Sequence, residues 1–189
     1  HRIWKKILIA LSELSEGSMA LDIASGTADI PKIINKKFNS VSVHVTDINE
    51  SMLALGKDRA INENFFQNCN FALASGEDLP YQDKTFDLVT VGFGLRNFTN
   101  KRKGLEEMKR VVRSGGLVAA YVWDIREGGF PLEPIHAVLR AKGIEYPLPP
   151  SVEASRMVNL KSLWDTAGLT SVEVRRITCE TVSYTHLRA

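Results

Sequence analysis

Apolar runs and amphipathic stretches alternate along the chain. Five runs rich in Val, Ile, Leu, Ala and Phe are typical of strands buried on both faces, and they occupy residues 19–24, 41–46, 70–74, 86–91 and 117–123. Two intervening segments place apolar residues on one helical face, the first with Ile30, Ile33, Ile34 and Phe38 and the second with Leu105, Met108, Val111 and Val112. This alternation predicts an α/β fold with a doubly wound, mostly parallel sheet.

The second half of the chain continues the alternation with one interruption. Asn100 is the expected N-cap of the helix that carries Leu105, and Gly115 and Gly116 follow its last turn. Prolines and glycines then break the pattern, so we interpret residues 126–158 as an insertion on the substrate side, with one short helix near residues 135–141. Beyond it we expect a helix near residues 160–167 and two strands, residues 170–177 and 178–184, the last of them truncated. The expected sheet therefore has seven strands.

Composition narrows the class of protein. The 189 residues fit a single domain, and a formal net charge of +2 gives no broad basic face for nucleic acid. No apolar run approaches the roughly 18 residues that a transmembrane helix needs. Cys69 and Cys179 lie far apart, without the clustered spacing of a zinc site or the cysteine density of a secreted scaffold. We therefore expect a cytoplasmic protein that binds no metal and no nucleic acid.

A turn of small residues joins the first predicted strand to the first predicted helix. Residues 22–29 read Asp-Ile-Ala-Ser-Gly-Thr-Ala-Asp, and small side chains let a ligand approach the backbone and the helix N-terminus. Asp47 ends the next strand, 21 residues after Gly26, about where a doubly wound fold presents a carboxylate to ribose hydroxyls. The turn of small residues and Asp47 together predict a cofactor that contains adenosine.

The charge of the turn favours one such cofactor. Dinucleotide-binding dehydrogenases use Gly-x-Gly-x-x-Gly, whereas this turn holds one glycine, so a dehydrogenase is a distant alternative. Asp22 would repel a diphosphate and attract a sulfonium and an ammonium group, both of which S-adenosylmethionine carries. A tight turn with Asp29 as a favourable first-turn acid is the purely structural alternative.

Five segments resemble the C-methyltransferases of ubiquinone and menaquinone biosynthesis, a branch of the class I S-adenosylmethionine-dependent methyltransferases. They are residues 1–5 (HRIWK), 22–29 (DIASGTAD), 46–53 (TDINESML), 76–80 (GEDLP) and 93–97 (FGLRN). The resemblance implies a Rossmann-like methyltransferase domain over residues 1–189, truncated at its N-terminus, with S-adenosylmethionine as cofactor. The C-terminal third is more similar to general small-molecule methyltransferases, which suggests a hybrid chain. Residues 185–189 resemble neither branch, and we interpret them as a non-native tail.

The resemblance also implies roles for single residues on the cofactor side. Thr27 and its neighbours would hold the methionine portion, and Asp47 would bind the ribose hydroxyls. Ile48 and Met52 would flank the adenine. Residues 75–76 would recognise the edge of the adenine. The residues expected to contact the cofactor are Asp22, Ala24, Ser25, Gly26, Thr27, Asp29, Asp47, Ile48, Met52, Ser75, Gly76, Glu77 and Gly92.

On the acceptor side, Arg96, Asn97 and Asp124 follow the fourth and fifth strands, where acceptors lie in this fold. The acceptor implied by the resemblance is a lipophilic quinol, either a polyprenyl benzoquinol or demethylmenaquinol, and peripheral contact with a membrane is a further expectation. O- or N-methylation of another small molecule and a non-catalytic cofactor-binding fragment both stay open. No catalytic residue is assigned, although a general base would assist a quinol and His136 is one candidate. The oligomeric state is left open.

Two further positions bear on the site. Ala28 stands where the family usually has glycine. Three tryptophans, Trp4, Trp123 and Trp164, could line an apolar pocket, but we interpret them mainly as core residues, with Trp4 as a candidate lid residue.

Overall fold

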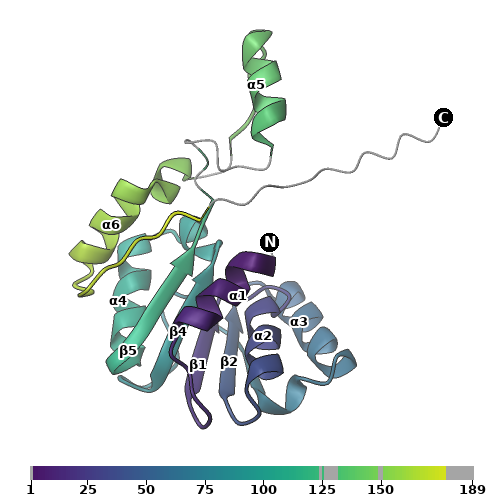
Figure 1. Cartoon of the computed structure of the whole chain (residues 1–189), viewed down its shortest axis with the longest axis vertical. Helices are drawn as coiled ribbons and strands as arrows, with labels where there is room; N and C mark the ends of the chain where they lie inside the picture. The colour runs from purple at the N-terminus through teal and green to yellow at the C-terminus, as the bar shows by residue number, and fades with distance from the viewer. Residues whose placement is uncertain (1, 124, 126–131, 149–150, 178–189) are drawn as a thin grey trace, which may run out of the picture.

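A parallel sheet forms the centre of the molecule (Figure 1). The computed structural model describes residues 2–123, 125, 132–148 and 151–177, and within them the sheet has five strands in the order β3-β2-β1-β4-β5. The strands are β1 (Met19–Ile23), β2 (Ser42–Asp47), β3 (Cys69–Leu73), β4 (Phe86–Gly92) and β5 (Val112–Tyr121). Every neighbouring pair is parallel, which confirms the predicted doubly wound α/β fold. The strand order reverses between β1 and β4, at the kind of switch point where such sheets bind ligands.

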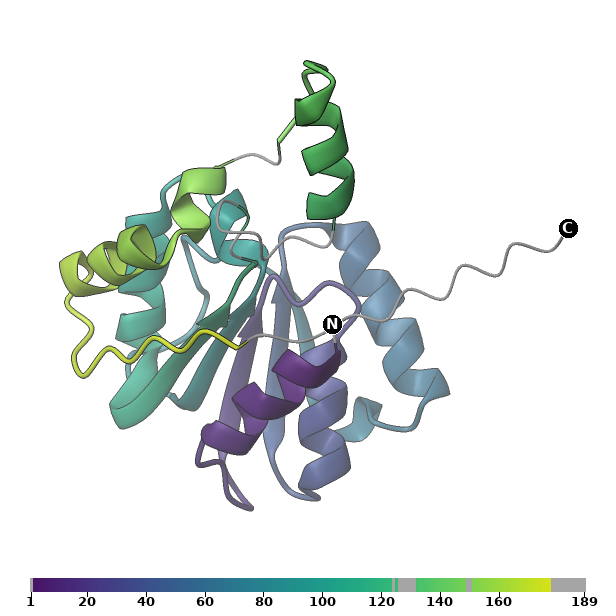
Figure 2. The same cartoon turned by 45° about the horizontal axis from the view of Figure 1, so that its top comes forward.

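Helices cover both faces of the sheet. They are α1 (Arg2–Leu11), α2 (Asp29–Lys37), α3 (Glu50–Asn62), α4 (Lys101–Val111), α5 (Glu133–Ala141) and α6 (Met157–Thr166), with short 3-10 turns η1 (Phe66–Asn68), η2 (Gly94–Asn97) and η3 (Val152–Ser155). Side chains of α1 and α2 contribute to one buried cluster and those of α4 and α6 pack on a second cluster. In Figure 2 these pairs lie on opposite sides of the strands. No helix in the described part of the chain is long and apolar enough to cross a bilayer.

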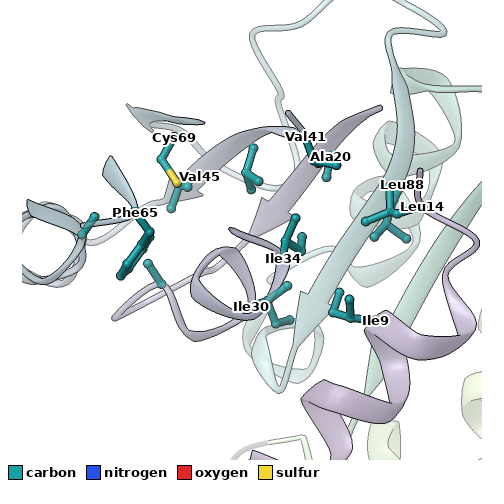
Figure 3. Packing of buried hydrophobic residues seen from close by; sticks show 13 residues of the cluster. Ile9, Leu14, Ala20, Ile30, Ile34, Val41, Val45, Phe65, Cys69 and Leu88 are labelled. Carbon is teal, nitrogen blue, oxygen red and sulfur yellow. The ribbon is translucent and has the colours of Figure 1, made fainter. Parts of the chain in front are cut away.

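The two clusters form because strand side chains alternate between the faces. In β1, Ala20 belongs to the same cluster as Ile9 and Ile34, on the α1–α2 side (Figure 3). Leu21 and Ile23 belong to the opposite cluster. The same alternation turns Asp22 toward the α1–α2 side. A carboxylate is thus placed at the end of a buried strand, beneath α1.

Asparagines begin the two helices that follow β2 and β4. The side-chain oxygen of Asn49 accepts a hydrogen bond from Met52 N at the start of α3, and that of Asn100 accepts one from Lys103 N at the start of α4. The second cap confirms a prediction. Helix α4 ends at Val111, before the expected glycine stop, because residue 112 is already extended and pairs with Phe86 as the start of β5.

The last part of the described chain differs from expectation. Residues 170–177 were predicted as a strand but form none, and Val174 and Ile177 are exposed. An alternating sequence becomes a strand only when a neighbouring strand satisfies its backbone groups. The next predicted strand, residues 178–184, lies outside the described residues. Residues 185–189 lie outside them as well. The insertion at residues 126–158 is described in part, as α5 and η3, and the extent of the domain stays a prediction.

Candidate functional site

The turn after β1 is held in an unusual backbone conformation. Ala24, Gly26 and Ala28 all have positive φ angles, of 51°, 55° and 58°. The left-handed region disfavours residues with a Cβ, so Ala28 occupies a position that suits glycine, as the family pattern suggested. Ser25 N donates to Thr46 O at 3.0 Å, which ties the turn to the end of β2. Strain of this kind concentrates at functional sites.

Asp22 is buried directly below the turn, with 2% of its surface exposed. Its carboxylate accepts hydrogen bonds from Ser25 Oγ at 2.5 Å and from Thr90 Oγ1, on the neighbouring β4, at 2.6 Å. Burial raises the pKa of Asp22 to about 6, although both hydrogen bonds and the charge of Lys5 favour the ionised form. A carboxylate so poorly solvated gains strongly from a cationic ligand.

Asp47 lies on the other side of the turn, at the end of β2. One carboxylate oxygen accepts from Gly26 N at 2.8 Å and the other from Asn49 N at 2.9 Å. Each oxygen keeps a second acceptor position for a ligand hydroxyl. The structure therefore brings Asp22, Ser25, Gly26 and Asp47 together, as the sequence predicted for a single site.

Helix α3 packs one face against the outside of the turn. A Cβ added at Gly56 would lie 2.7 Å from Gly26 O, and one added at Gly26 would lie 3.4 Å from Met52 Cε. One helical turn further on, Arg59 Nη1 donates to Thr27 O at 2.9 Å. The carbonyl of Thr27 is thereby fixed, and Met52 is placed beside the turn, where it was expected to flank adenine.

Asp29 connects three helices at the base of the site. Its carboxylate receives hydrogen bonds from Lys5 of α1 and from Arg59 of α3, the latter at 2.6 Å. Partial burial opposes its ionisation, but the hydrogen bonds from Lys5 and Arg59 hold the pKa of Asp29 below its ordinary value. Asp29 thus anchors α1 and α3 to the first turn of α2, and its expected contact with a cofactor stays a prediction.

The residues expected at the adenine lie after β2 and β3. Ile48 is 73% exposed, and its side chain is therefore open to a ligand. Gly76 is enclosed, because an added Cβ would lie 2.3 Å from the ring of Phe98 and 2.9 Å from Ile23. Ser75 Oγ accepts from Glu77 N at 3.1 Å.

The carboxylate of Glu77 binds the loop before α4. It accepts hydrogen bonds from Thr99 N at 2.7 Å and Asn100 N at 3.1 Å, so in this structure it fixes the loop before α4. The expected contact of Glu77 with a cofactor stays a prediction.

The acceptor side begins at the end of β4. Gly92 is covered by Tyr121 of β5, whose hydroxyl would lie 2.3 Å from an added Cβ. Arg96 follows in η2, and its Nη1 atom is buried and has no hydrogen-bond partner among the residues that the structure describes. Asn97 is exposed. Asp124 lies outside the described residues.

His136 lies in the insertion, on α5. It is 7% exposed and its ring stacks on Tyr146, with 4.1 Å between the ring centroids. In Figure 1, α5 stands apart from the sheet and from α2 and α3. The described contacts therefore give His136 no place at the turn after β1.

Three residues of the site carry no motif that marks them in the sequence. Thr90 is aligned with Asp22 in the β1–β4 register, and its position as a polar residue between Val89 and Val91 is the only local signal. Lys5 and Arg59 are basic residues on helices α1 and α3, and their shared partner Asp29 becomes evident only in the folded chain.

The polar groups around the turn suit a cationic nucleoside ligand. Asp22 offers a buried carboxylate, Asp47 offers a second one, and small residues separate them. The unpaired nitrogen of Arg96 adds a hydrogen-bond donor for an anionic or carbonyl oxygen. The edge can therefore hold a cation beside a group that accepts hydrogen bonds.

Comparison with known proteins points to one family of methyltransferases. Residues 1–124 match the model of the ubiE/COQ5 methyltransferase family. A ubiquinone/menaquinone biosynthesis C-methyltransferase UbiE from Hydrogenovibrio crunogenus is 47% identical over 117 residues, which cover 61% of this chain and 46% of that protein. The UbiE protein of Cupriavidus taiwanensis is 39% identical and covers 97% of this chain and 80% of that protein. The chain thus spans from about half to four fifths of the length of these relatives.

A solved structure of an S-adenosylmethionine-dependent methyltransferase from Aquifex aeolicus superposes with a TM-score of 0.65 at 20% identity, over 87% of this chain and 78% of that one. At this level of identity the likeness concerns the fold alone.

Proposed function

The chain belongs to the ubiE/COQ5 methyltransferase family, and on that basis we propose that it is an S-adenosylmethionine-dependent C-methyltransferase. Its proposed acceptor is a polyprenyl benzoquinol or demethylmenaquinol. The observation that carries the proposal is the pair of carboxylates, Asp22 and Asp47, on either side of the Gly26 turn at the switch point of the sheet. Two acids around one glycine suit a cationic nucleoside better than a diphosphate.

Four residues in and around the turn have proposed parts in holding the cofactor. Asp22 would attract its positive charge, Asp47 would accept hydrogen bonds from its ribose hydroxyls, and Ile48 and Met52 would contact its adenine. When bound, the cofactor supplies an electrophilic methyl group and leaves as S-adenosylhomocysteine. The protein then contributes chiefly by holding the two reactants in contact, which removes a large part of the activation barrier of such displacements.

Arg96 has the proposed part on the acceptor. A quinol attacks through a ring carbon more readily when its hydroxyl proton has been removed, because the negative charge spreads onto the ring. The unpaired Nη1 of Arg96 would donate to that oxygen and stabilise its charge. Overall, the methylated ring carbon loses its hydrogen as one proton, which balances the charge lost from the cofactor.

The insertion supports a lipophilic acceptor. Helix α5 and the turn before it expose Leu132, Ile135 and Val138, with 47%, 57% and 55% of their surfaces accessible. In Figure 1 this helix stands beyond the edge at which the strands end. Apolar side chains in that position suit a polyprenyl tail or the surface of the membrane that contains it. A cytoplasmic location, inferred from cysteine usage, is part of the same proposal.

The test is methyl incorporation from S-[methyl-³H]adenosylmethionine. We expect label in demethylmenaquinol or a polyprenyl benzoquinol, at a ring carbon, and not in simple phenols or amines. Asp22→Asn and Asp47→Asn should each weaken cofactor binding, whereas Asp58→Asn on the exposed side of α3 should not. Label in a hydroxyl or amine instead would establish the O- or N-methyltransferase alternative. Bound cofactor without transfer to any acceptor would refute catalysis, and a rise in Tm with NAD alone would refute the cofactor assignment.

A further inference from the structure

Four aromatic side chains from three separate segments meet at the edge of the sheet beside the site. Trp4 of α1 packs edge-on against Trp123, at 5.9 Å between centroids, and Trp123 stacks on Phe93, at 5.5 Å and 24° between planes. Phe93 in turn packs edge-on against Tyr121 at 4.8 Å. We call Trp4, Phe93, Tyr121 and Trp123 the aromatic wall.

The wall is separate from most of the hydrophobic core. Among the described residues, neither buried cluster includes Trp4, Phe93 or Trp123, and only Tyr121 packs against one of them. All four rings are partly exposed rather than buried. Large aromatic side chains that pack on one another and stay partly exposed are typical of binding surfaces.

The wall adjoins the proposed cofactor turn. The hydroxyl of Tyr121 covers Gly92, and burial raises the pKa of Tyr121, with the negative charges of Asp22 and Asp29 adding to the effect. Tyr121 also packs against the buried cluster that contains Ala28, so the Tyr121 end of the wall lies near the turn after β1. The wall therefore extends from the cofactor side outward to α1.

The backbone of Phe93 is strained in a way that places its ring in the wall. Phe93 has φ 57° and ψ −15°, in the left-handed region that bulky residues avoid. Its N–H donates to Tyr121 O at 3.0 Å, which fixes the conformation. Three residues later, in the 3-10 turn that Phe93 begins, lies Arg96 with its unpaired buried nitrogen. A flat apolar surface and a hydrogen-bond donor thus come from one short segment.

We propose that the aromatic wall is the binding surface for the acceptor's ring, and that it selects acceptors with a flat aromatic nucleus. This inference rests on the proposed function, because it assumes that a methyl acceptor enters at this edge. The ring lies against the wall and its hydroxyl oxygen accepts from Arg96. Trp123 and Trp4 form the outer end of this surface, where removal of a ring would disturb the cofactor turn least.

The test compares acceptor and cofactor binding in matched variants. Trp123→Leu should raise the KM for demethylmenaquinol by about five- to tenfold, in line with the contribution of one aromatic contact, and should leave the Kd of S-adenosylhomocysteine within about twofold of wild type. Trp123→Phe should restore most of the affinity. Trp164→Leu is the matched control, because Trp164 packs on the opposite face with the second cluster and should change Tm without changing KM.

Direct binding separates this inference from the proposed function. Calorimetric titration with 1,4-naphthalenediol, in the presence of S-adenosylhomocysteine, requires no turnover. Binding to wild type that Trp123→Leu weakens would support the wall even if no methyl transfer occurs. Equal binding to both proteins would overturn it. Loss of affinity for S-adenosylmethionine, with affinity for S-adenosylhomocysteine intact, would also overturn it, since the wall would then contact the sulfonium.

Discussion

Replacing Asp22 by asparagine should stabilise the protein at neutral pH and weaken its site. The carboxylate of Asp22 is buried beneath the turn and has a pKa of about 6, against an ordinary value of 3.8. A raised pKa means that the folded protein favours the protonated form. The contribution of Asp22 to stability is therefore fully present below pH 3.8 and is lost as the pH rises through 6.

The size of the effect follows from the two pKa values. At about 1.36 kcal/mol per pKa unit, the difference corresponds to about 3 kcal/mol, of which about 2 kcal/mol falls between pH 4 and pH 8. Asparagine keeps an acceptor for Ser25 or Thr90 and has no charge to desolvate. The stability of Asp22→Asn relative to wild type should therefore increase by about 2 kcal/mol over this pH range.

Urea denaturation followed by circular dichroism, at intervals from pH 4 to pH 8, measures this difference. Asp29 has a lowered pKa and loses its stabilising effect as the pH falls, but both proteins contain it, so it cancels in the comparison. Asp58→Asn, on the exposed side of α3, is the control and should show a flat difference. Parallel curves for wild type and Asp22→Asn would refute the assignment of a raised pKa to this carboxyl.

Three further predictions concern the surroundings of the turn. Gly56→Ala should weaken the binding of S-adenosylhomocysteine in calorimetry, because the new Cβ would lie 2.7 Å from Gly26 O, and such overpacking costs about 1–3 kcal/mol. Arg59→Met should raise the same Kd several-fold, because the contacts that hold the turn and Asp29 are lost. Cys69 should resist iodoacetamide at pH 8 until the protein unfolds, because burial raises the pKa of its thiol to about 11.

Each of these predictions has a control. Asp58→Ala is the control for Gly56→Ala, because it changes an exposed residue of the same helix. Arg102→Met is the control for Arg59→Met, because it removes an exposed ion pair, with Glu106, that lies on α4. The labelling of Cys69 is read in Cys179→Ser, where it is the remaining thiol. Unchanged Kd values in both test variants would show that α3 does not position the turn, and rapid alkylation of the folded protein would contradict the burial of Cys69.

Local signals predicted the sheet and its turn well. The buried strands contain apolar residues at nearly every position, and the placement of Asp47 beside Gly26 follows from its place at the end of the next parallel strand. The Asn100 cap was likewise evident from its position before a periodic segment. These features depend on neighbours within one βαβ unit, and a sequence pattern can therefore reveal them.

Features that depend on distant segments could not be predicted in the same way. The partners of Asp29 come from α1 and α3, and the aromatic wall joins Trp4 to Trp123 across most of the described chain. Trp123 was interpreted as core because it ends the apolar run of residues 117–123, whereas its exposure depends on what packs beyond the sheet edge. The failed strand at residues 170–177 has the same origin, since alternation does not supply a pairing partner.

The order of the strands also has a consequence for how the chain acquires its site. Strand β1 can pair with β2 as soon as both have been synthesised, but Thr90, the partner of Asp22 on β4, follows it by 68 residues. Pairings across such separations close late, because a long loop must be ordered first. Until β4 has been synthesised, one edge of β1 therefore has no neighbouring strand, and Asp22 lacks one of its two hydroxyl donors. A ligand that requires both sides of this carboxylate would bind only after β4 has joined, and would favour that last step of folding.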